Sequence, residues 1–197
     1  MKKKKLFVVG AGGHGRSVAE AAMLGTAWSE VVFVDDAYPL LRYSGQWPIV
    51  ANIESLAGLI AREDSVVIAI GNQSVRKRLF GLAQDAGAMM ATIIHPKAWV
   101  SQDASIGDGT AVMAGAIIGT QAKVGMGAIV NANATVDHDA VLGDFAHLGV
   151  GVQLAGGVVV GDGAWLQAGT CAGYRVRVPP DAVVLPGTAL QAVEAQT

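Results

Sequence analysis

From residue 100 to residue 188 the sequence repeats every six residues without an insertion. In the first twelve repeats the leading position is aliphatic, and in all fifteen the residue four places later is small or β-branched. The twelve leading residues are Val100, Ile106, Val112, Ile118, Val124, Val130, Val136, Leu142, Leu148, Leu154, Val160 and Leu166. A period of six is neither helical nor a plain strand alternation, so it indicates a short strand, a bend and another strand. Because one unit cannot bury its apolar side alone, the units must stack into a β-solenoid.

The composition fits this architecture and restricts the classes of function. Of the 197 residues 52% are hydrophobic, only 6% are aromatic and 26 are glycine, which favours small side chains and tight turns. The formal net charge of −2 argues against a general nucleic-acid binder, because such proteins carry a basic surface. The charge is uneven, with 11 Lys/Arg against 8 Asp/Glu in residues 1–97 and 3 against 8 in residues 98–197.

The first half has the pattern of a small α/β unit. Hydrophobic runs predict strands over residues 5–9, 31–34, 66–70 and 92–94, and helical patterns cover 17–24, 53–61 and 74–86. Alternation of strands and helices predicts a parallel sheet whose carboxyl edge binds ligands. His95-Pro96 marks the junction, which divides the chain into domains at 1–96 and 97–197.

A glycine-rich turn follows the first predicted strand. Gly10, Gly12 and Gly15 match the dinucleotide fingerprint, and Asp35 lies 20 residues after Gly15. The unit is only about half the size of a full dinucleotide fold, so there is room for one nucleotide and an NAD site is disfavoured. The turn brings backbone N–H groups close to a phosphate or sugar, unless it is a tight turn without a ligand.

The two halves together resemble a known family. The hexads are similar to those of the hexapeptide-repeat acyltransferases, and the combination with the α/β unit is similar to the NeuD/PglD-type sugar acetyltransferases. The resemblance implies a Rossmann-like half domain followed by a left-handed parallel β-helix with three hexads per coil, hence five coils. It further implies acetyl-CoA as co-substrate, a homotrimer with sites between subunits, and acetylation of nucleotide-linked amino sugars or of sialic-acid hydroxyls.

The chemistry is predicted at His138, which stands between Asp137 and Asp139 at an outward hexad position. Acetyl transfer to an amine needs a proton acceptor, and histidine has a suitable pKa. The family motif of a histidine followed by an acid falls on His138 and Asp139, which implies a general base and the carboxylate that enhances it. From the residues alone, Asp137 remains an alternative partner.

The resemblance also implies the binding residues. The nucleotide sugar is assigned to the glycine turn, the acidic pair and the glycine after the third strand, namely Gly12, Gly13, His14, Asp35, Asp36 and Gly71. Acetyl-CoA is assigned to His147, Gly156 and Ala168. His147 follows His138 by nine residues, half an 18-residue coil, so the two face apart within one chain and meet only between packed chains. Outward apolar residues such as Ile117 and Ile129 also indicate a packed partner surface.

Other sites and locations are disfavoured. Cys171 has no neighbouring base, and two solenoid histidines are too few for a three-histidine zinc site, so no metal is expected. No apolar run reaches the length of a membrane span, and the lysine-led start breaks into glycines, unlike a signal peptide. A single cysteine fits a reducing compartment, so the cytoplasm is expected. The Gly-x-Pro-Ala-Lys-like segment that usually lies near the CoA adenine is missing.

We therefore predict an acetyl-CoA-dependent N-acetyltransferase that acts on the amino group of a nucleotide-activated amino sugar by direct transfer. One alternative is O-acetylation of a sialic-acid-like sugar. The other is a non-catalytic trimer that binds a nucleotide sugar, although a scaffold has no need of an exposed histidine between two acids.

Overall fold

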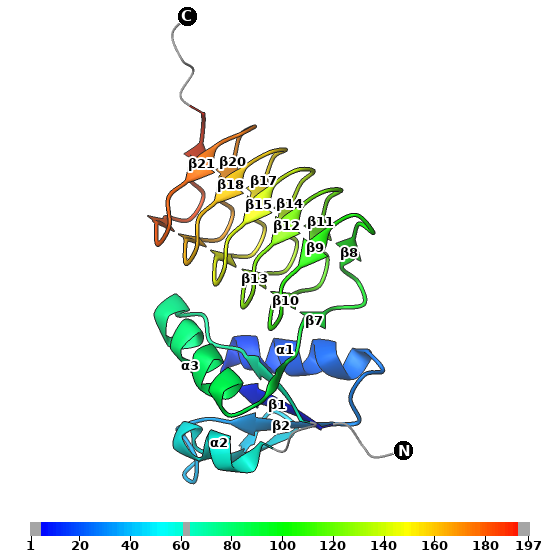
Figure 1. The fold of residues 1–197 in the computed structure, drawn as a ribbon, viewed down its shortest axis with the longest axis vertical. Coiled ribbons are helices and arrows are strands. Elements are labelled where there is room, and N and C mark those ends of the chain that lie inside the picture. The colour runs from blue at the N-terminus through cyan, green and yellow to red at the C-terminus, as the bar shows by residue number, and fades with distance from the viewer. Residues whose placement is uncertain (1–4, 61–63, 193–197) are drawn as a thin grey trace, which may run out of the picture.

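The computed structural model describes residues 5–60 and 64–192, which form two units packed against each other (Figure 1). The first is an α/β unit, and the second is a three-sided stack of parallel strands. Three of the four lysines of the N-terminal run, at positions 2–4, and the predicted helix end at Ala61 lie outside the described residues. The predicted fold class, an α/β unit followed by a left-handed parallel β-helix, is confirmed.

The α/β unit is built on one six-stranded sheet with the order β3-β4-β2-β1-β5-β6. Adjacent strands in this sheet run parallel to each other, except β3 and β4, which form an antiparallel hairpin. The strands are β1 (Lys5–Val9), β2 (Glu30–Val34), β3 (Tyr43–Ser44), β4 (Trp47–Ala51), β5 (Ser65–Ile68) and β6 (Met89–Met90). The helices are α1 (Gly13–Leu24), η1 (Ile53–Ser55), α2 (Leu56–Leu59) and α3 (Gln73–Asp85). The central strands are buried on both faces, which explains their continuous hydrophobic runs.

Several elements differ from the sequence prediction. Helix α1 begins at Gly13, four residues earlier than expected, and the helix expected over 53–61 is divided into η1 and α2. Strands β3, β4 and β6 were not predicted. In β4 the cause is Pro48, which weakens a strand pattern and is tolerated here in the edge hairpin.

The solenoid contains three parallel sheets, which we name after a central strand. The β16 sheet comprises β7 (Ile93–Ile94), β10 (Ala111–Val112), β13 (Ile129–Val130), β16 (His147–Leu148), β19 (Trp165–Leu166) and β22 (Val183–Val184). The β14 sheet comprises β8 (Trp99–Val100), β11 (Ile117–Ile118), β14 (Thr135–Val136), β17 (Gln153–Leu154), β20 (Cys171–Ala172) and β23 (Ala189–Leu190). The β15 sheet comprises β9 (Ser105–Ile106), β12 (Lys123–Val124), β15 (Val141–Leu142), β18 (Val159–Val160) and β21 (Arg177–Val178).

The strand predicted over 92–94 belongs to the solenoid instead of the α/β sheet, because β7 pairs with β10. Ile94 lies one hexad step before Val100, so the repeat begins earlier than the expected start. The prediction of five coils was therefore too low, since two of the three sheets contain six strands.

The aliphatic hexad positions fill the solenoid core, where Val112, Ile118 and Leu148 have no exposed surface. Side chains alternate along a strand, so the residue before each of them faces outward. On the β16 sheet the outward Ile93 and Ala111 pack into the same cluster as Val8 and Val18 of the α/β unit. The apolar outward surface expected to meet a partner chain is thus covered, on these first strands, by the chain's own N-terminal unit.

Helix α3 makes a second contact between the units. Its Phe80 packs edge to face on Phe145 of the solenoid, with ring centroids 5.3 Å apart. Among residues 5–60 and 64–192, no helix combines the length and the apolar character that crossing a bilayer requires.

Candidate active site

His138 lies on the turn between β14 and β15, at the edge where their two sheets meet. Its side chain is 46% exposed. Asp139 has a φ of 59°, a left-handed conformation that aspartate tolerates better than most residues. This bend brings the Asp139 carboxylate to 2.8 Å from His138 Nδ1, while the backbone N–H of His138 donates to Asp137 Oδ1 at 2.7 Å.

The two acids therefore have different roles in the structure. Asp139 contacts the ring, and Asp137 Oδ2 stays 4.0 Å from Nε2, beyond hydrogen-bond distance. The hydrogen bond with Asp139, and then the charges of Asp137 and Asp139, raise the pKa of His138 above its ordinary value. When Nδ1 carries the proton shared with Asp139, Nε2 has a free lone pair directed away from the carboxylate. Such an imidazole can accept a proton from a ligand.

Gly156 lies one coil after His138 and leaves room for its ring. A Cβ at Gly156 would come within 2.5 Å of both Cε1 and Nε2 of His138. The glycine is buried beneath the imidazole. In one chain, Gly156 thus supports the orientation of His138, a contact that the expected acetyl-CoA role did not include.

A second cluster forms where the α/β unit meets the β16 sheet. His147, the outward residue of β16, lies beside Gly71, where an added Cβ would be 3.7 Å from His147 Cε1. The His147 ring stacks on Trp165, with centroids 5.8 Å apart and an interplanar angle of 14°. Burial, then Arg76, then His14 lower the pKa of His147 from 6.5 to about 4. Burial and Arg76 lower the pKa of His14 to about 4 as well.

Arg76 of α3 joins this cluster and was not singled out from the sequence. Its guanidinium donates to backbone carbonyls on both units, and its side chain is 1% exposed. The signal was present, because Arg76 stands at helical spacing with Leu79, Phe80 and Ala83, all of them buried. An arginine in the apolar stripe of a helix is an anomaly that sequence reasoning can detect.

The glycine turn leads directly into the N-terminus of a helix. Helix α1 begins directly after Gly12, so the first amide groups of the helix point out of its N-terminus. Gly15 permits close packing, because a Cβ there would overlap the carbonyl oxygen of Gly10.

The acidic pair after β2 is engaged with backbone amides. Asp35 accepts from the N–H groups of Ala11 and Ala37, at 2.7 and 2.9 Å, and thereby fastens the glycine turn to the end of β2. Asp36 accepts from the N–H of Ile53 at 3.0 Å. The sequence predicted ligand contacts at these two positions, and the structure adds a loop-fixing role.

Six of the eleven predicted site residues form two groups within one chain. Gly71, His14 and His147 come together at the junction of the units. His138, Asp139 and Gly156 lie at the edge between the β14 and β15 sheets, opposite the β16 sheet in a three-sided solenoid. Ala168 is exposed on the turn between β19 and β20, apart from both groups.

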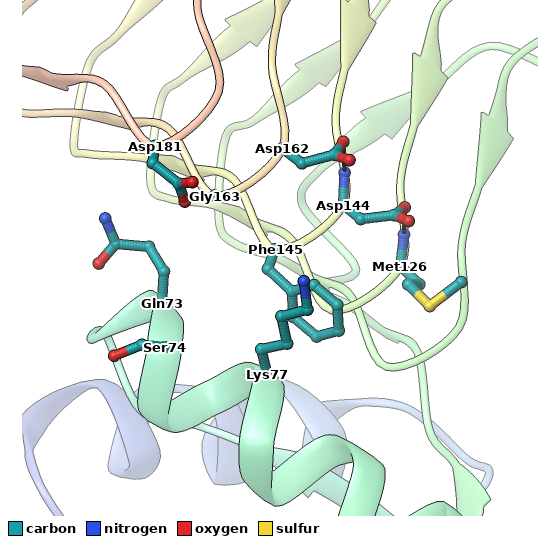
Figure 2. A pocket seen from close by; sticks show the side chains of 9 residues that line it. All are labelled: Gln73, Ser74, Lys77, Met126, Asp144, Phe145, Asp162, Gly163 and Asp181. Carbon is teal, nitrogen blue, oxygen red and sulfur yellow. Dashed lines mark hydrogen bonds between the residues drawn. The ribbon is translucent and has the colours of Figure 1, made fainter.

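A groove of about 390 Å³ runs between the N-terminal end of α3 and one edge of the solenoid (Figure 2). Gln73, Ser74 and Lys77 line it from the helix, and a column of aspartates lines the other side. Asp144 Oδ1 accepts from the Met126 N–H, and Asp162 Oδ1 accepts from the Asp144 N–H, both at 2.9 Å. These aspartates connect successive coils, and none of the residues predicted from the sequence lines the groove.

Within residues 5–60 and 64–192, no three His, Cys, Asp or Glu side chains are arranged to hold a metal ion. Cys171 is exposed on the β14 sheet.

Comparisons with known proteins agree with this geometry. The model of the PglD N-terminal domain family matches residues 5–81. A UDP-N-acetylbacillosamine N-acetyltransferase from Bacillus subtilis is 35% identical over 115 residues, which cover 55% of this chain and 51% of the relative. The chain thus spans about half the length of this curated relative.

Two groups of solved structures match over nearly the whole chain. The acetyltransferase domain of PglB from Neisseria gonorrhoeae, in complex with acetyl coenzyme A, is 32% identical with a TM-score of 0.90, over 96% of this chain and 93% of that one. A histidine-to-asparagine variant of perosamine N-acetyltransferase from Caulobacter crescentus, in complex with CoA and GDP-perosamine, is 32% identical with a TM-score of 0.75, over 96% and 91%.

Proposed function

The chain belongs to the PglD-type family of sugar acetyltransferases, and from that premise we propose that it is an acetyl-CoA-dependent N-acetyltransferase for a nucleotide-activated amino sugar. The observation that carries the proposal is the His138–Asp139 pair, with its free Nε2 on an exposed edge of the solenoid. N-acetylation is favoured over O-acetylation, because the bacillosamine and perosamine enzymes to which the chain is similar are N-acetyltransferases.

Transfer is direct. The sugar amine attacks the carbonyl carbon of the acetyl thioester, so a C–N bond forms and the C–S bond breaks. His138 Nε2 accepts the proton that the nitrogen loses, and Asp139 stabilises the resulting imidazolium through Nδ1. The proton then passes to the departing CoA sulfur, which leaves as the thiol, and His138 returns to its neutral form.

The nucleotide sugar is held by the N-terminal unit. Its phosphates face the amides of Gly12, Gly13 and His14 at the start of α1, where the helix dipole favours negative charge. Carboxylates repel phosphate, so the acidic pair at Asp35 and Asp36 faces the hydroxyl or base N–H groups. Gly71 follows β5 at the same carboxyl edge of the sheet and completes the assigned set.

The active site is completed between chains of a homotrimer. The N-terminal unit covers the β16 sheet, whereas His138 occupies the opposite edge of the same solenoid. A sugar held by one chain therefore meets the His138 of another. Acetyl-CoA lies between these solenoids, where Gly156 and Ala168 of different chains approach it. The single cysteine and these substrates fit a cytoplasmic enzyme.

The test is a thermal-shift screen with acetyl-CoA and with UDP-, GDP-, CMP- and dTDP-linked amino sugars, followed by mass analysis of the products. We expect one amino sugar to raise Tm and to gain an acetyl group on nitrogen. Acetylation of only a hydroxyl, or of no sugar in the series, would contradict the proposal.

A further inference from the structure

The solenoid half of the chain is poor in positive charge. Residues 98–197 contain three Lys/Arg side chains, Lys123, Arg175 and Arg177, against eight Asp/Glu. Acetyl-CoA carries a diphosphate and a further phosphate on its ribose, so an acidic solenoid repels it unless a cation lies where these groups bind. Lys123 and Arg177 belong to strands β12 and β21 of the β15 sheet. Arg175 is the one of the three that stands on the turns between the β14 and β15 sheets, the edge that carries His138.

His138 and Arg175 lie two coils apart on this edge, where the turns follow one another along the solenoid (Figure 1). The backbone N–H of Gly157 donates to the carbonyl of His138 at 3.0 Å. In the next coil, the N–H of Arg175 donates to the carbonyl of Gly156 at 3.1 Å. Neighbouring strands are about 4.8 Å apart, so roughly 10 Å separates the two turns. A ligand that extends from His138 over Gly156, which is assigned to acetyl-CoA, therefore reaches Arg175.

The pantetheine arm of acetyl-CoA has a suitable length. About thirteen bonds lie between the thioester sulfur and the nearer phosphorus, and they span roughly 15 Å when extended, by the reach of an extended backbone. The arm thus covers the roughly 10 Å between the two turns without being fully extended. With the thioester at His138, the diphosphate lies at the coil of Arg175, and the adenosine with its 3′-phosphate extends beyond it.

The Arg175 side chain is held by its neighbours and still has donors to offer. Its guanidinium carbon lies 4.9 Å from the centroid of the Tyr174 ring, and Tyr174 itself is 55% exposed. The stem passes over Gly157, where an added Cβ would be 3.3 Å from Arg175 Cγ. Within residues 5–60 and 64–192, no carboxylate forms an ion pair with this guanidinium. Stacking fixes the plane of the guanidinium and leaves the N–H groups at its edge free for an anion.

We propose that Arg175 binds the diphosphate of acetyl-CoA and that Tyr174 is the positioning residue that holds its guanidinium. The proposal rests on the proposed function, which places the thioester at His138. The planar fork of an arginine matches two phosphate oxygens, so the contact is both charged and directional. It gives the nucleotide end of acetyl-CoA a partner in a chain that lacks the Gly-x-Pro-Ala-Lys-like segment.

The first test is calorimetric titration of the full chain with acetyl-CoA, without any sugar. Arg175→Gln suits the corner, because Gln121 has the same φ of 58° three coils earlier. We expect this variant to weaken Kd about tenfold, the size of one charged hydrogen bond. The loss should persist with 3′-dephospho-acetyl-CoA, which keeps the diphosphate, and should shrink at high salt. Arg177→Gln, exposed in the same coil but on the β15 sheet, is the matched control and should bind like the wild type.

The role of Tyr174 has its own readout. Tyr174→Phe keeps a ring beneath the guanidinium and should bind acetyl-CoA like the wild type, whereas Tyr174→Leu should weaken binding. In the Arg175→Gln background Tyr174→Leu should add little, because the ring acts through the arginine. Equal losses in Tyr174→Phe and Tyr174→Leu, or fully additive losses in the double variant, would refute the positioning role.

Kinetics separate the phosphate contact from the rest of the site. Arg175→Gln should raise KM for acetyl-CoA and leave both kcat and KM for the nucleotide sugar nearly unchanged. With S-acetylpantetheine as the donor, which has no phosphate, wild type and variant should have equal kcat/KM. An unchanged Kd for acetyl-CoA in Arg175→Gln, a loss that disappears with the 3′-dephospho compound, or an equal loss in Arg177→Gln would overturn the proposal. If the wild-type chain binds acetyl-CoA but acetylates no amino sugar, the proposed function fails while the titrations still decide the role of Arg175.

Discussion

At the scale of the residue, the free Nε2 of His138 is the atom on which the chemistry depends. We expect His138→Ala to lower kcat by roughly 10²–10⁴-fold, the usual contribution of a general base. The side chain is half-exposed, so its removal should leave Tm nearly unchanged. Steady-state kinetics and thermal unfolding measure the two effects, with His95→Ala as a control outside the site. A folded variant with near-normal kcat would exclude His138 as the base.

The pH dependence of kcat/KM shows which of the two aspartates is the hydrogen-bond partner of the His138 ring. The base acts unprotonated, and Asp139 and Asp137 raise its pKa, so activity should rise with pH through a value above 6.5. Asp139→Asn replaces the charged acceptor of the ring hydrogen bond, the largest cause of the raised pKa, with a neutral one, so the acidic limb of kcat/KM should move to lower pH while the plateau falls. Asp137→Asn should move the limb less. A larger shift with Asp137→Asn would reverse the two assignments.

Sequence reasoning reached some of these residues and missed others for physical reasons. The hexad register placed His138 outward between two acids, because a repeat fixes which way each side chain points. The register could not show that Asp139 adopts a left-handed φ and so contacts the ring. Nor could it show that Asp35 fastens the glycine turn, since that bond joins residues 24 positions apart.

At the scale of the element, the turn between β17 and β18 supports the turn that carries His138. We expect Gly156→Ala to displace the His138 ring, because the added Cβ would lie 2.5 Å from Nε2. The result should be a reduced kcat in a folded protein, since a flexible side chain can yield. Gly173→Ala is a matched control in the next coil, where the nearest atom is an ordinary 3.4 Å away. Equal activity in both variants would show that the contact does not position the base.

Elements with a strong period were predictable and elements that depend on pairing were not. The solenoid strands repeat one local pattern, so the sequence defines them almost individually. Strands β4 and β6 form by pairing with the edges of β2 and β5. The sequences of β4 and β6 do not themselves show a clear alternation of apolar and polar residues. Strand β7 was assigned to the wrong sheet, because a two-residue apolar segment fits either neighbour.

At the scale of the whole molecule, the buried histidines between the units make stability depend on pH. His14 and His147 have a pKa of about 4 when folded, against an ordinary 6.5 when unfolded. Below pH 6.5 the two histidine rings bind protons in the unfolded chain but stay unprotonated in the folded chain until the pH approaches 4. Stability should therefore fall as the pH drops from 6.5 to about 4, by a few kcal/mol for the pair.

Urea unfolding at neutral pH and near pH 4.5 measures this loss. We expect the double variant His14→Gln, His147→Gln to lose less stability over the same interval, because glutamine does not titrate. An identical loss in the double variant would show that these rings do not carry the pH dependence.

The separation of His138 from the sugar-binding N-terminal unit within one chain leads to a prediction about the proposed homotrimer. His138 occupies the solenoid edge opposite the sheet that the N-terminal unit covers, so the two halves of one site come from different chains. At a low concentration of the nucleotide sugar, His138→Ala and Asp36→Ala should each have little activity alone, the first because it lacks the base and the second because it lacks a side-chain contact to the sugar. The two variants are mixed in equal amounts, denatured together and refolded. About one site in four should then be intact in random trimers, because an intact site needs its His138 from one variant and its sugar contact from the other. Light scattering should give three times the chain mass of 20.1 kDa. The refolded mixture should recover about a quarter of wild-type activity, whereas a site formed within one chain would recover none.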